Sequence, residues 1–310
     1  MKSMVKPLIL GTRGSALALA QSKLVREALE AAHAGLGITQ KMITTTGDAR
    51  TGMSLHEPAA EGAGLFTRQL EEALLSGAID LAVHSLKDLP VEVPEGLVLA
   101  AILPRAPVQD LLISRYEGGV AGLPVGATIG TSSPRRALLI KAKRPDLTIV
   151  PIRGNVPTRL AKIAGSSQET RYDATILASA GLGRLGHDAS AGFLRVDGEK
   201  LFLESLDWML PAPGQGAIAV ETRIDDPLVG LLAPLHHDAT ARCVRAERLV
   251  LRYLGGGCHL ALGTLAVESA SQISLSAVLF PDEQSAPRYG EATAPTDSEV
   301  ARLVTAFLTS

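Results

Sequence analysis

The sequence predicts an α/β fold with two similar α/β domains and a small α+β domain at the C-terminal end. Strand-like and helix-like segments alternate along the first part of the chain, and the same order of segments returns after residue 128. From Asp238 onward the pattern changes to one helix, a group of strands and a last helix. Alternating strands and helices indicate a parallel sheet covered by helices, and a chain of 310 residues is long for one hydrophobic core.

The first domain begins with a strand, a turn and a helix. We expect a strand over Pro7–Leu10, a turn at 11–15, a helix over Ala16–Ala34, a strand at 38–46, a polar loop at 48–61, a helix at 64–76 and a strand at 79–83. The first helix is rich in Ala, Leu, Gln, Lys and Glu, whereas the second strand carries β-branched residues. The third strand runs into Ser85, Lys87 and Asp88, so these side chains should follow its carboxyl end.

Segments of the second domain repeat segments of the first. Thr128-Ile129 runs into a Gly-Thr-Ser-Ser turn as Ile9-Leu10 runs into the turn at 11–15, and residues 172–179 resemble 79–85. Pro and Gly cluster near 104–107 and 211–216, and the buried strand after residue 216 can return to the first sheet. We therefore expect domain 1 at 1–104 and 214–237, domain 2 at 105–213 and domain 3 at 238–310.

Positive charge gathers in residues 130–159. This window holds seven Lys and Arg residues against one acid, Asp146, although the chain has a formal net charge of -2. Guanidinium groups bind carboxylates and phosphates through paired hydrogen bonds, and burying several of them without an acid is unfavourable. We therefore expect an arginine-lined cleft that receives a ligand with several negative charges. For Lys141, Lys143 and Arg144, late in the predicted helix, a solvated helix face is the better interpretation.

The arginines of this window stand at two turns. Arg135 and Arg136 follow a Thr-Ser-Ser-Pro turn, in which either serine is a suitable N-cap and the proline suits the first helical turn. Arg153 and Arg159 flank Gly154-Asn155, a second strand-to-helix turn. A helix N-terminus presents free N–H groups and the positive end of a dipole, so both turns are expected to attract anions.

The third domain contains the two cysteines. We expect helices at 240–254 and 299–308 and strands at 260–267, 273–279 and 288–292. Three glycines stop the first helix and place Cys258 in a loop, where a reactive and an inert thiol are equally good interpretations. Cys243 lies on an apolar helix face and is expected in the core. His259, His236 and His237 match no zinc spacing, so no metal site is predicted, and a Cys–His hydrolase would need partners adjacent in space.

Composition excludes several function classes. Aromatic residues make up only 3% of the chain, which argues against a binder that stacks single-stranded bases. The near-neutral charge argues against non-specific DNA binding, and no apolar run is long enough to cross a membrane. Residues 1–10 do not resemble a signal peptide, and two cysteines do not make a disulfide framework. We expect a cytoplasmic enzyme with no nucleic-acid or membrane partner.

Asp88 is the best candidate for acid–base chemistry. A carboxylate that follows the carboxyl end of a parallel strand is well placed to give or take a proton. Its alternative role is to cap the turn before Pro90, as many loop aspartates do. His84, four residues earlier, is expected to be half-buried and structural.

Several longer motifs follow one another in a characteristic order. They read Gly-Thr-Arg-Gly-Ser-Ala-Leu-Ala-Leu-Ala-Gln at 11–21, Gly-Leu-Phe-Thr-Arg-Gln-Leu-Glu at 64–71, Ala-Val-His-Ser-Leu-Lys-Asp-Leu-Pro at 82–90, Gly-Thr-Ser-Ser-Pro-Arg-Arg at 130–136, Arg-Gly-Asn-Val-Pro-Thr-Arg-Leu at 153–160, Pro-Gly-Gln-Gly-Ala at 213–217 and Gly-Gly-Cys at 256–258. No single motif is decisive, but the ordered set resembles the porphobilinogen deaminase family closely, over nearly the whole chain.

The resemblance implies three domains, the first two similar to type 2 periplasmic binding proteins, with the active site between them. It implies a transferase, hydroxymethylbilane synthase, which joins four porphobilinogen units into hydroxymethylbilane with release of ammonia, in tetrapyrrole and haem biosynthesis. It also implies a monomer and a dipyrromethane cofactor that is bound through a thioether to Cys258. The catalytic residue that it implies is Asp88, which would protonate the departing amine and stabilise positive charge on the pyrrole nitrogen.

The resemblance also supplies a set of residues for binding the cofactor and substrate. These are Arg13, Ser15, Phe66, Ser85, Lys87, Thr131, Ser132, Ser133, Arg135, Arg136, Arg153, Gly154, Asn155, Arg159 and Gln215. The chain departs from the family at 61–64, where Glu-Gly-Ala-Gly replaces Gly-Gly-Lys-Gly, and Arg68 is a candidate substitute for the missing lysine. Pro134, Gly255 and His259 also differ from the usual family residues.

Two other function classes remain open. A solute binder that clamps a dicarboxylate between two domains would need neither Cys258 nor Asp88. A phosphate-using enzyme could be built on the Gly-Thr-Ser-Ser turn, but the chain has no Gly-x-x-x-x-Gly-Lys-Ser/Thr motif.

Overall fold

The structure is a computed structural model that describes residues 7–43, 67–165, 172–256, 260–282 and 284–309. The chain separates into two compact units, of which the first comprises Met1–Arg105 with Ala217–Arg245 and the second Ala106–Gly216 with Ala246–Ser310. The strands are β1 Leu8–Thr12, β2 Ile38–Met42, β3 Leu81–Ser85, β4 Leu97–Ile102, β5 Asp110–Ser114, β6 Thr128–Gly130, β7 Thr148–Val150, β8 Ala174–Ala178, β9 Phe193–Val196, β10 Glu199–Ser205, β11 Ile218–Arg223, β12 Ala261–Ser269, β13 Gln272–Phe280 and β14 Arg288–Ala294. The helices are α1 Ala16–Ala32, α3 Arg68–Leu75, η3 Leu86–Asp88, α4 Gly119–Gly122, α5 Pro134–Lys143, α6 Val156–Ala164, α7 Ser179–Arg184, α8 Leu228–Leu232, η4 Ala233–Leu235, α9 Asp238–Tyr253 and α10 Asp297–Thr309.

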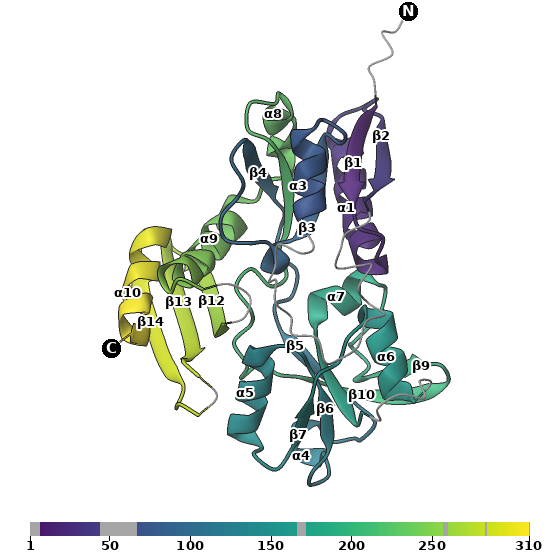
Figure 1. Ribbon diagram of the computed structural model, residues 1–310, viewed down its shortest axis with the longest axis vertical. Helices are drawn as coiled ribbons and strands as arrows, with labels where there is room; N and C mark the ends of the chain where they lie inside the picture. The colour runs from purple at the N-terminus through teal and green to yellow at the C-terminus, as the bar shows by residue number, and fades with distance from the viewer. Residues whose placement is uncertain (1–6, 44–66, 166–171, 257–259, 283, 310) are drawn as a thin grey trace, which may run out of the picture. The chain divides into compact units, whose positions relative to one another are not determined.

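The first unit is built on a mixed sheet with the strand order β2-β1-β3-β11-β4 (Figure 1). Strands β2, β1 and β3 are parallel, whereas β11 is antiparallel to both β3 and β4. Val25 and Leu29 of α1 pack with Val83 on one face of β3, and Leu70 of α3 packs with Ala82 on the other. The expected parallel sheet is therefore mixed, because β11 enters it from a distant stretch of the chain.

The second unit repeats this arrangement. Its sheet has the order β7-β6-β8-β5-β10-β9, in which β7, β6 and β8 are parallel and β5 is antiparallel to β8. The triplet β7-β6-β8 thus corresponds to β2-β1-β3, and in both sheets the next strand is antiparallel. This common order confirms the repeat that the sequence indicates.

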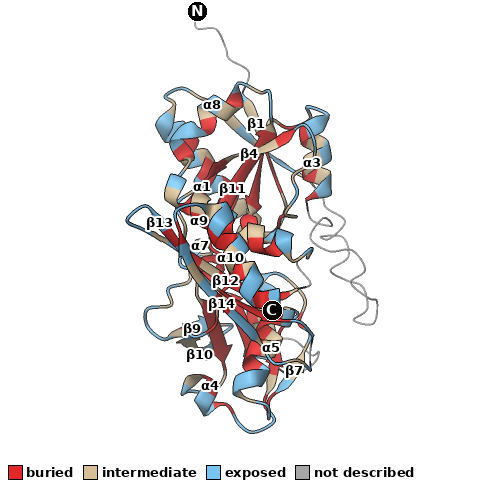
Figure 2. Cartoon of the chain, turned by 90° about the vertical axis from the view of Figure 1, so that its left-hand side faces the viewer, coloured by how far each residue is buried: buried red, intermediate tan, exposed pale blue. Residues whose placement is uncertain are grey.

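A three-stranded antiparallel sheet, β12-β13-β14, completes the second unit. Ala261, Val278 and Phe280 of this sheet belong to the same hydrophobic core as Leu139 and Ile140 of α5. Buried strands shown in red in Figure 2 form the centre of each sheet. The C-terminal sheet therefore packs on the second unit, although it has its own hydrogen bonds.

The structure confirms the α/β class and the main predicted elements. The helices predicted after the turns at 11–15 and 130–134 are α1 and α5, and the three C-terminal strands are β12 to β14. Strands β4, β5, β9 and β10 were not predicted. The loop at 48–61 lies outside the described residues. The division into three domains stays a prediction, since contacts group the C-terminal sheet with the second unit.

Helix α9 ends as the glycines predict. The N–H of Gly256 donates to the carbonyl of Leu251 and that of Gly255 to Arg252, and Gly255 has a φ of 65°. Cys243, on this helix, is buried as expected.

No helix in the described part of the chain is long and apolar enough to span a membrane.

Candidate functional site

A small polar cavity lies in the first unit at the ends of β1 and β3. It has a volume of about 70 Å³. Its lining residues are Arg13, Ser15, Leu17, Ala18, Gln21, Thr67, Val83, His84, Ser85 and Asp88. The structure thus brings together Arg13, Ser15, Ser85 and Asp88 from the predicted set, while Lys87 is not among the lining residues.

Local structure explains how these side chains are held. Ser15 is the N-cap of α1 and accepts a hydrogen bond from the N–H of Ala18 at 3.2 Å. Ser85, the last residue of β3, exchanges hydrogen bonds with Gln21 at 2.8 and 3.1 Å. Asp88 ends the short helix η3 and is exposed. Two fixed hydroxyls and an exposed carboxylate therefore surround the same small space.

One lining residue of the cavity, His84, belongs to a buried pair of titratable groups. His84 Nε2 is 3.0 Å from Glu221 Oε2, and both side chains are almost completely buried. The prediction that His84 is half-buried is therefore wrong in degree, although its hydrogen bond to β11 fits the structural role.

Burial raises the pKa of Glu71, on α3, and the charge of Glu221 adds to this effect.

In the second unit, two strand–turn–helix junctions lie side by side. Ser133 is the N-cap of α5 and accepts from the N–H of Arg136, while Asn155 is the N-cap of α6 and accepts from the N–H of Thr158 at 3.0 Å. Ser132 links the junctions, because its hydroxyl donates to the carbonyl of Ile152 at 2.9 Å. Thr131 is buried beside them. The sequence left two candidates for the first cap, and the structure selects Ser133.

The paired arginines do not lack an acid. Nη2 of Arg135 donates to Oδ2 of Asp110, and Nη2 of Arg136 donates to Oδ1, both at 2.7 Å. Asp110 is fully buried, and both arginines are more than nine-tenths buried. The premise that Arg135 and Arg136 are unpaired in the protein is therefore wrong, because their partner comes from β5, outside the basic window. Burial lowers the pKa of Arg135 in spite of that partner.

Gln215 shares this acid. Its Nε2 donates to Asp110 Oδ1 at 2.9 Å and to the carbonyl of Val108 at 2.7 Å, and the residue is fully buried. In the observed structure Gln215, Arg135 and Arg136 are thus held by protein acceptors, and a role of these three residues in ligand binding stays a prediction.

The second turn leaves its cations more accessible. Arg153 is half-buried and makes no hydrogen bond or ion pair with another described residue, whereas Arg159 Nε donates to the carbonyl of Gly154 at 2.8 Å. Gly154 has a φ of 111°, and a Cβ there would lie 2.7 Å from Thr158. Glycine is therefore needed at this turn, and Arg153 is available for an anion.

Arg184, at the end of α7, is a candidate that the sequence analysis missed. Its Nη2 donates to the carbonyl of Gly216 at 2.6 Å, and burial lowers its pKa to about 10. Within the described ranges no carboxylate forms an ion pair with it. No local motif marks Arg184, because it stands alone in an Ala-Gly-Leu-Gly-Arg segment and its hydrogen-bond acceptor, Gly216, lies more than thirty residues later in the chain.

Some predicted site residues cannot be placed. Phe66 and Cys258 lie outside the described residues, as do the Glu-Gly-Ala-Gly segment at 61–64 and His259. Arg68, the candidate substitute for the family lysine, instead pairs with Glu72 at 2.9 Å on the exposed side of α3.

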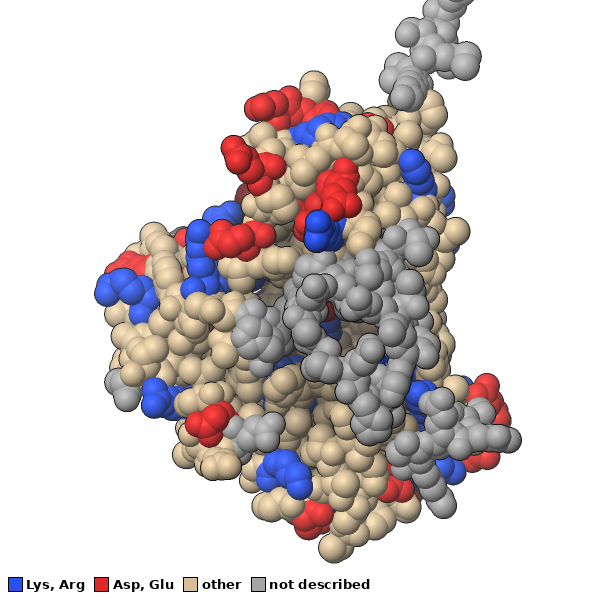
Figure 3. Space-filling view, in the orientation of Figure 1, with Lys and Arg blue, Asp and Glu red and all other residues tan. Residues whose placement is uncertain are grey.

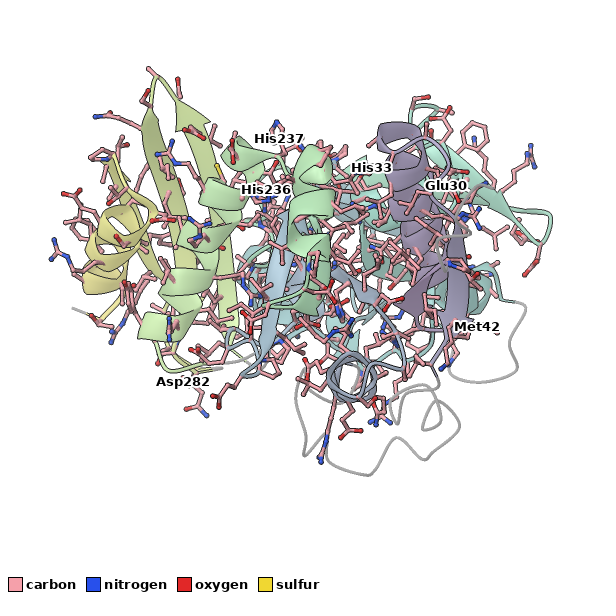
Figure 4. All side chains as sticks on the ribbon, turned by 90° about the horizontal axis from the view of Figure 1, so that it is seen from above. Glu30, His33, Met42, His236, His237 and Asp282 are labelled. Carbon is pink, nitrogen blue, oxygen red and sulfur yellow. The ribbon has the colours of Figure 1, made fainter. Side chains whose placement is uncertain are left out.

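The two neighbouring histidines, His236 and His237, are hydrogen-bonded to other residues of the first unit. Figure 4 labels both histidines. His236 Nδ1 accepts the N–H of Ile102, and His237 Nδ1 is 2.8 Å from the hydroxyl of Thr240. In the parts of the chain that the structure covers, no three His, Cys, Asp or Glu side chains gather as metal ligands would.

Among the residues that are coloured in Figure 3, positive and negative side chains form no separate patches on the face shown. Blue and red side chains are interspersed there among the coloured residues. The features that do gather are the N-caps, serines and arginines at the strand ends of both units. They define the class of the chain as an α/β protein in which capped strand–turn–helix junctions recur in both units.

Comparison with known sequences gives the particular family. The profile "Porphobilinogen deaminase, dipyromethane cofactor binding domain" matches residues 8–230, and "Porphobilinogen deaminase, C-terminal domain" matches residues 241–305. The chain therefore belongs to the porphobilinogen deaminase family, whose enzymes are transferases that carry a dipyrromethane cofactor.

Individual relatives agree with this assignment. The porphobilinogen deaminase of Roseiflexus sp. (strain RS-1) is 45% identical over 277 residues, which are 89% of this chain and 86% of the relative. That of Rubrobacter xylanophilus is 43% identical over 302 residues, 97% of this chain and 93% of the relative. Among solved structures, a nutrient binding protein from Burkholderia cenocepacia bound to methionine covers 73% of this chain and 90% of its own at 15% identity, with a TM-score of 0.41.

Proposed function

We propose that this chain is a hydroxymethylbilane synthase that joins porphobilinogen units on a dipyrromethane primer attached to Cys258. The observation that carries the proposal is the family membership together with an exposed aspartate, Asp88, in a polar cavity beside Arg13 and two serines. The primer would supply the pyrrole carbon to which each new unit is joined. The other steps fall to the side chains of the protein.

The residues present fit a ligand that carries several carboxylates. Arg184 is a partly buried cation that donates to one backbone carbonyl, and two buried guanidinium groups share the single charge of Asp110. The Nε atoms of Arg135 and Arg136 are also buried and have no partner among the described residues. Each of these sites leaves positive charge that a carboxylate would compensate. The accessible Arg153 and the N-termini of α5 and α6 add further anion-binding groups.

Within this proposal the two units have different tasks. In the first, Asp88 gives a proton to the departing amine, and afterwards accepts the proton that the joined pyrrole carbon loses. Ser15, Ser85 and Arg13 orient ligand groups in the same cavity. In the second unit, ligand carboxylates are held by the residues of the two junctions: Thr131, Ser132, Ser133, Arg153, Gly154, Asn155 and Arg159. A charge-assisted hydrogen bond contributes about 1.5–3 kcal/mol, so a few of them can retain a growing chain.

Partners and location are part of the proposal. We infer that porphobilinogen is the small-molecule substrate, and that the chain works as a monomer in the cytoplasm without nucleic-acid or membrane partners. Size-exclusion chromatography with light scattering should give the mass of one chain, and a dimer at working concentration would correct that part alone.

The first experiment is the intact mass of the purified chain, followed by peptide mapping. Added mass equal to two deaminated porphobilinogen units on Cys258 would support the proposal. If the chain is unmodified, it should acquire this mass on incubation with porphobilinogen. A Cys258 that stays bare after incubation would contradict the proposal, and would favour the solute binder, which needs no covalent anchor.

A further inference from the structure

Three described carboxylates are completely buried: Asp110, Glu221 and Glu247. Glu221 contacts His84 in the first unit. The other two belong to the second unit, and both are hydrogen-bonded to the same turn, Gly214-Gln215. A buried charge is costly unless it is well compensated, so two of them at one turn need an explanation beyond the proposed catalytic roles.

Glu247 connects three parts of the second unit. It stands on α9, its Oε2 accepts the N–H of Gly214 at 2.7 Å, and its Oε1 accepts the N–H of Ala266 at 2.9 Å. Ala266 lies on β12, which follows residues 257–259 in the chain, whereas α9 precedes them. Glu247 therefore fixes the elements on either side of the segment that contains Cys258 and ties them both to the turn.

The turn continues the connection to the paired arginines. The side chain of Gln215 donates to Asp110, and the same carboxylate accepts hydrogen bonds from Arg135 and Arg136. Each arginine also has a second fixed bond, from Nη1 to the carbonyl of Leu210 or Ile176. An unbroken series of short contacts thus runs from β12 through Glu247, the turn and Asp110 to the first turn of α5.

The turn has little room to absorb a displacement. Gly214 and Gly216 have φ values of 75° and 88°, and a Cβ on Gly216 would lie 2.5 Å from the carbonyl oxygen of Ala106. The N–H of Ala106 also donates to the carbonyl of Gly216 at 3.2 Å. Packed interiors shift as units and do not deform continuously. A displacement of the turn caused by a substitution at Glu247 should therefore also displace Asp110.

We propose that Glu247 is a positioning residue that, through Gly214-Gln215 and Asp110, keeps the Arg135–Arg136 pair in register with α9 and β12, the two elements that flank residues 257–259 in the chain. The importance of this register for the reaction rests on the proposed function, in which a primer anchored at Cys258 has carboxylates that the basic junctions hold. The register itself is a property of the second unit and can be tested without ligand.

The direct test is hydrogen exchange of the unliganded Glu247→Gln variant. Glutamine keeps the shape, but its amide group faces one of the two N–H donors, so one hydrogen bond is lost and that donor is left bare. We expect amide exchange to speed up by about tenfold or more at Gly214 and Ala266, and also in the first turn of α5. Faster exchange at Gly214 and Ala266 with an unchanged α5 would overturn the proposal.

Asp173→Asn is the matched control. Asp173 also accepts a backbone N–H in the second unit, that of Thr128 at 2.8 Å, but it does not contact the Gly214-Gln215 turn. It should lower the melting temperature without faster exchange at Gly214. If it speeds exchange in α5 as much as Glu247→Gln does, general destabilisation explains both results and the proposal fails.

A second readout uses the covalent species. After incubation with porphobilinogen, the masses of the chain report how many units each molecule carries. With Glu247→Gln we expect fewer primed chains and a shift toward short intermediates, by about tenfold in the ratio of long to short species, as misplaced groups slow a reaction strongly. Gln215→Ala removes the hydrogen bond between the turn and Asp110. In the double variant, the effects of Glu247→Gln and Gln215→Ala on this ratio should therefore be non-additive.

The two readouts separate the proposals. Faster exchange in α5 of Glu247→Gln, together with a parent chain that never gains mass on incubation with porphobilinogen, would refute the proposed function and leave the positioning role standing. Normal exchange in α5 combined with a normal distribution of masses would refute the positioning role and leave the function standing.

Discussion

Arg184 donates from Nη2 to the carbonyl of Gly216 at 2.6 Å, and burial lowers the pKa of its guanidinium to about 10. A carbonyl dipole compensates a partly buried cation only in part, because part of the hydration of the charge is lost. The structure therefore holds Arg184 at a cost, which a ligand carboxylate would offset.

For Arg184→Gln we expect weaker ligand binding without a matching loss of stability. Loss of a charge-assisted hydrogen bond should raise the KM for porphobilinogen by an amount equivalent to about 1.5–3 kcal/mol. The melting temperature should stay the same or rise, since a partly buried charge without a carboxylate partner among the described residues is removed. A clear fall in melting temperature with an unchanged KM would show that Arg184 serves the fold.

Replacing Asp88 by Asn separates chemistry from folding. Asp88 is exposed at the end of η3, so unfolding by denaturant should change within about 0.5 kcal/mol. Turnover should fall by about 10²–10⁴-fold, because an amide cannot exchange a proton with the departing amine. Near-normal turnover of porphobilinogen would contradict the acid–base role.

The arginines of the basic window should divide into two groups. The sequence alone predicts that Arg136→Ala impairs elongation more than folding. The structure predicts a larger cost to folding, because the change removes the hydrogen bonds of Arg136 to Asp110 and to the carbonyl of Ile176. Loss of the charged bond should cost about 1.5–3 kcal/mol of unfolding free energy, while Arg135 still pairs with Asp110.

Arg153→Ala is the comparison. Arg153 has no partner among the described residues, so its loss should leave stability within about 0.5 kcal/mol and affect only ligand retention. Urea unfolding and the masses of the covalent species measure both quantities. Equal stability losses for the two variants would show that the bonds of Arg136 to Asp110 contribute nothing.

Glu71 should make stability depend on pH. Its pKa is raised above the ordinary value of 4.5, chiefly by burial. At pH values between the ordinary pKa and the raised pKa, the folded chain therefore binds more protons than the unfolded chain. Stability then falls as pH rises through this window. The Glu71→Gln variant lacks this loss of stability. The difference in unfolding free energy, variant minus parent, should therefore be larger at about pH 7 than at about pH 4.

Chemical unfolding of both proteins at the two pH values measures this difference. Glu72→Gln, on the exposed side of the same helix, controls for simple loss of a negative charge. An advantage that is the same at both pH values, or larger at the lower one, would contradict the assignment.

Much of the fold is visible in the sequence because it depends on neighbouring residues. Ser15, Ser133 and Asn155 cap helices within their own turns, and the glycines after Tyr253 stop α9 through local hydrogen bonds. The repeat of strand, turn and helix also predicts the two sheets. Strands β4, β5, β9 and β10 were missed, since short apolar runs lack a period that distinguishes them from other buried segments.

The candidate site shows the same division. The capped turns, their serines and arginines, the position of Asp88 after a strand and the family motifs can all be predicted from the sequence, because each is carried by residues close together in the chain. Which cations are compensated becomes visible only in the folded chain. Asp110 reaches Arg135 and Arg136 from another strand, and Gly216 reaches Arg184 from a distant loop. Charge compensation acts through space, so no local pattern of residues can reveal it.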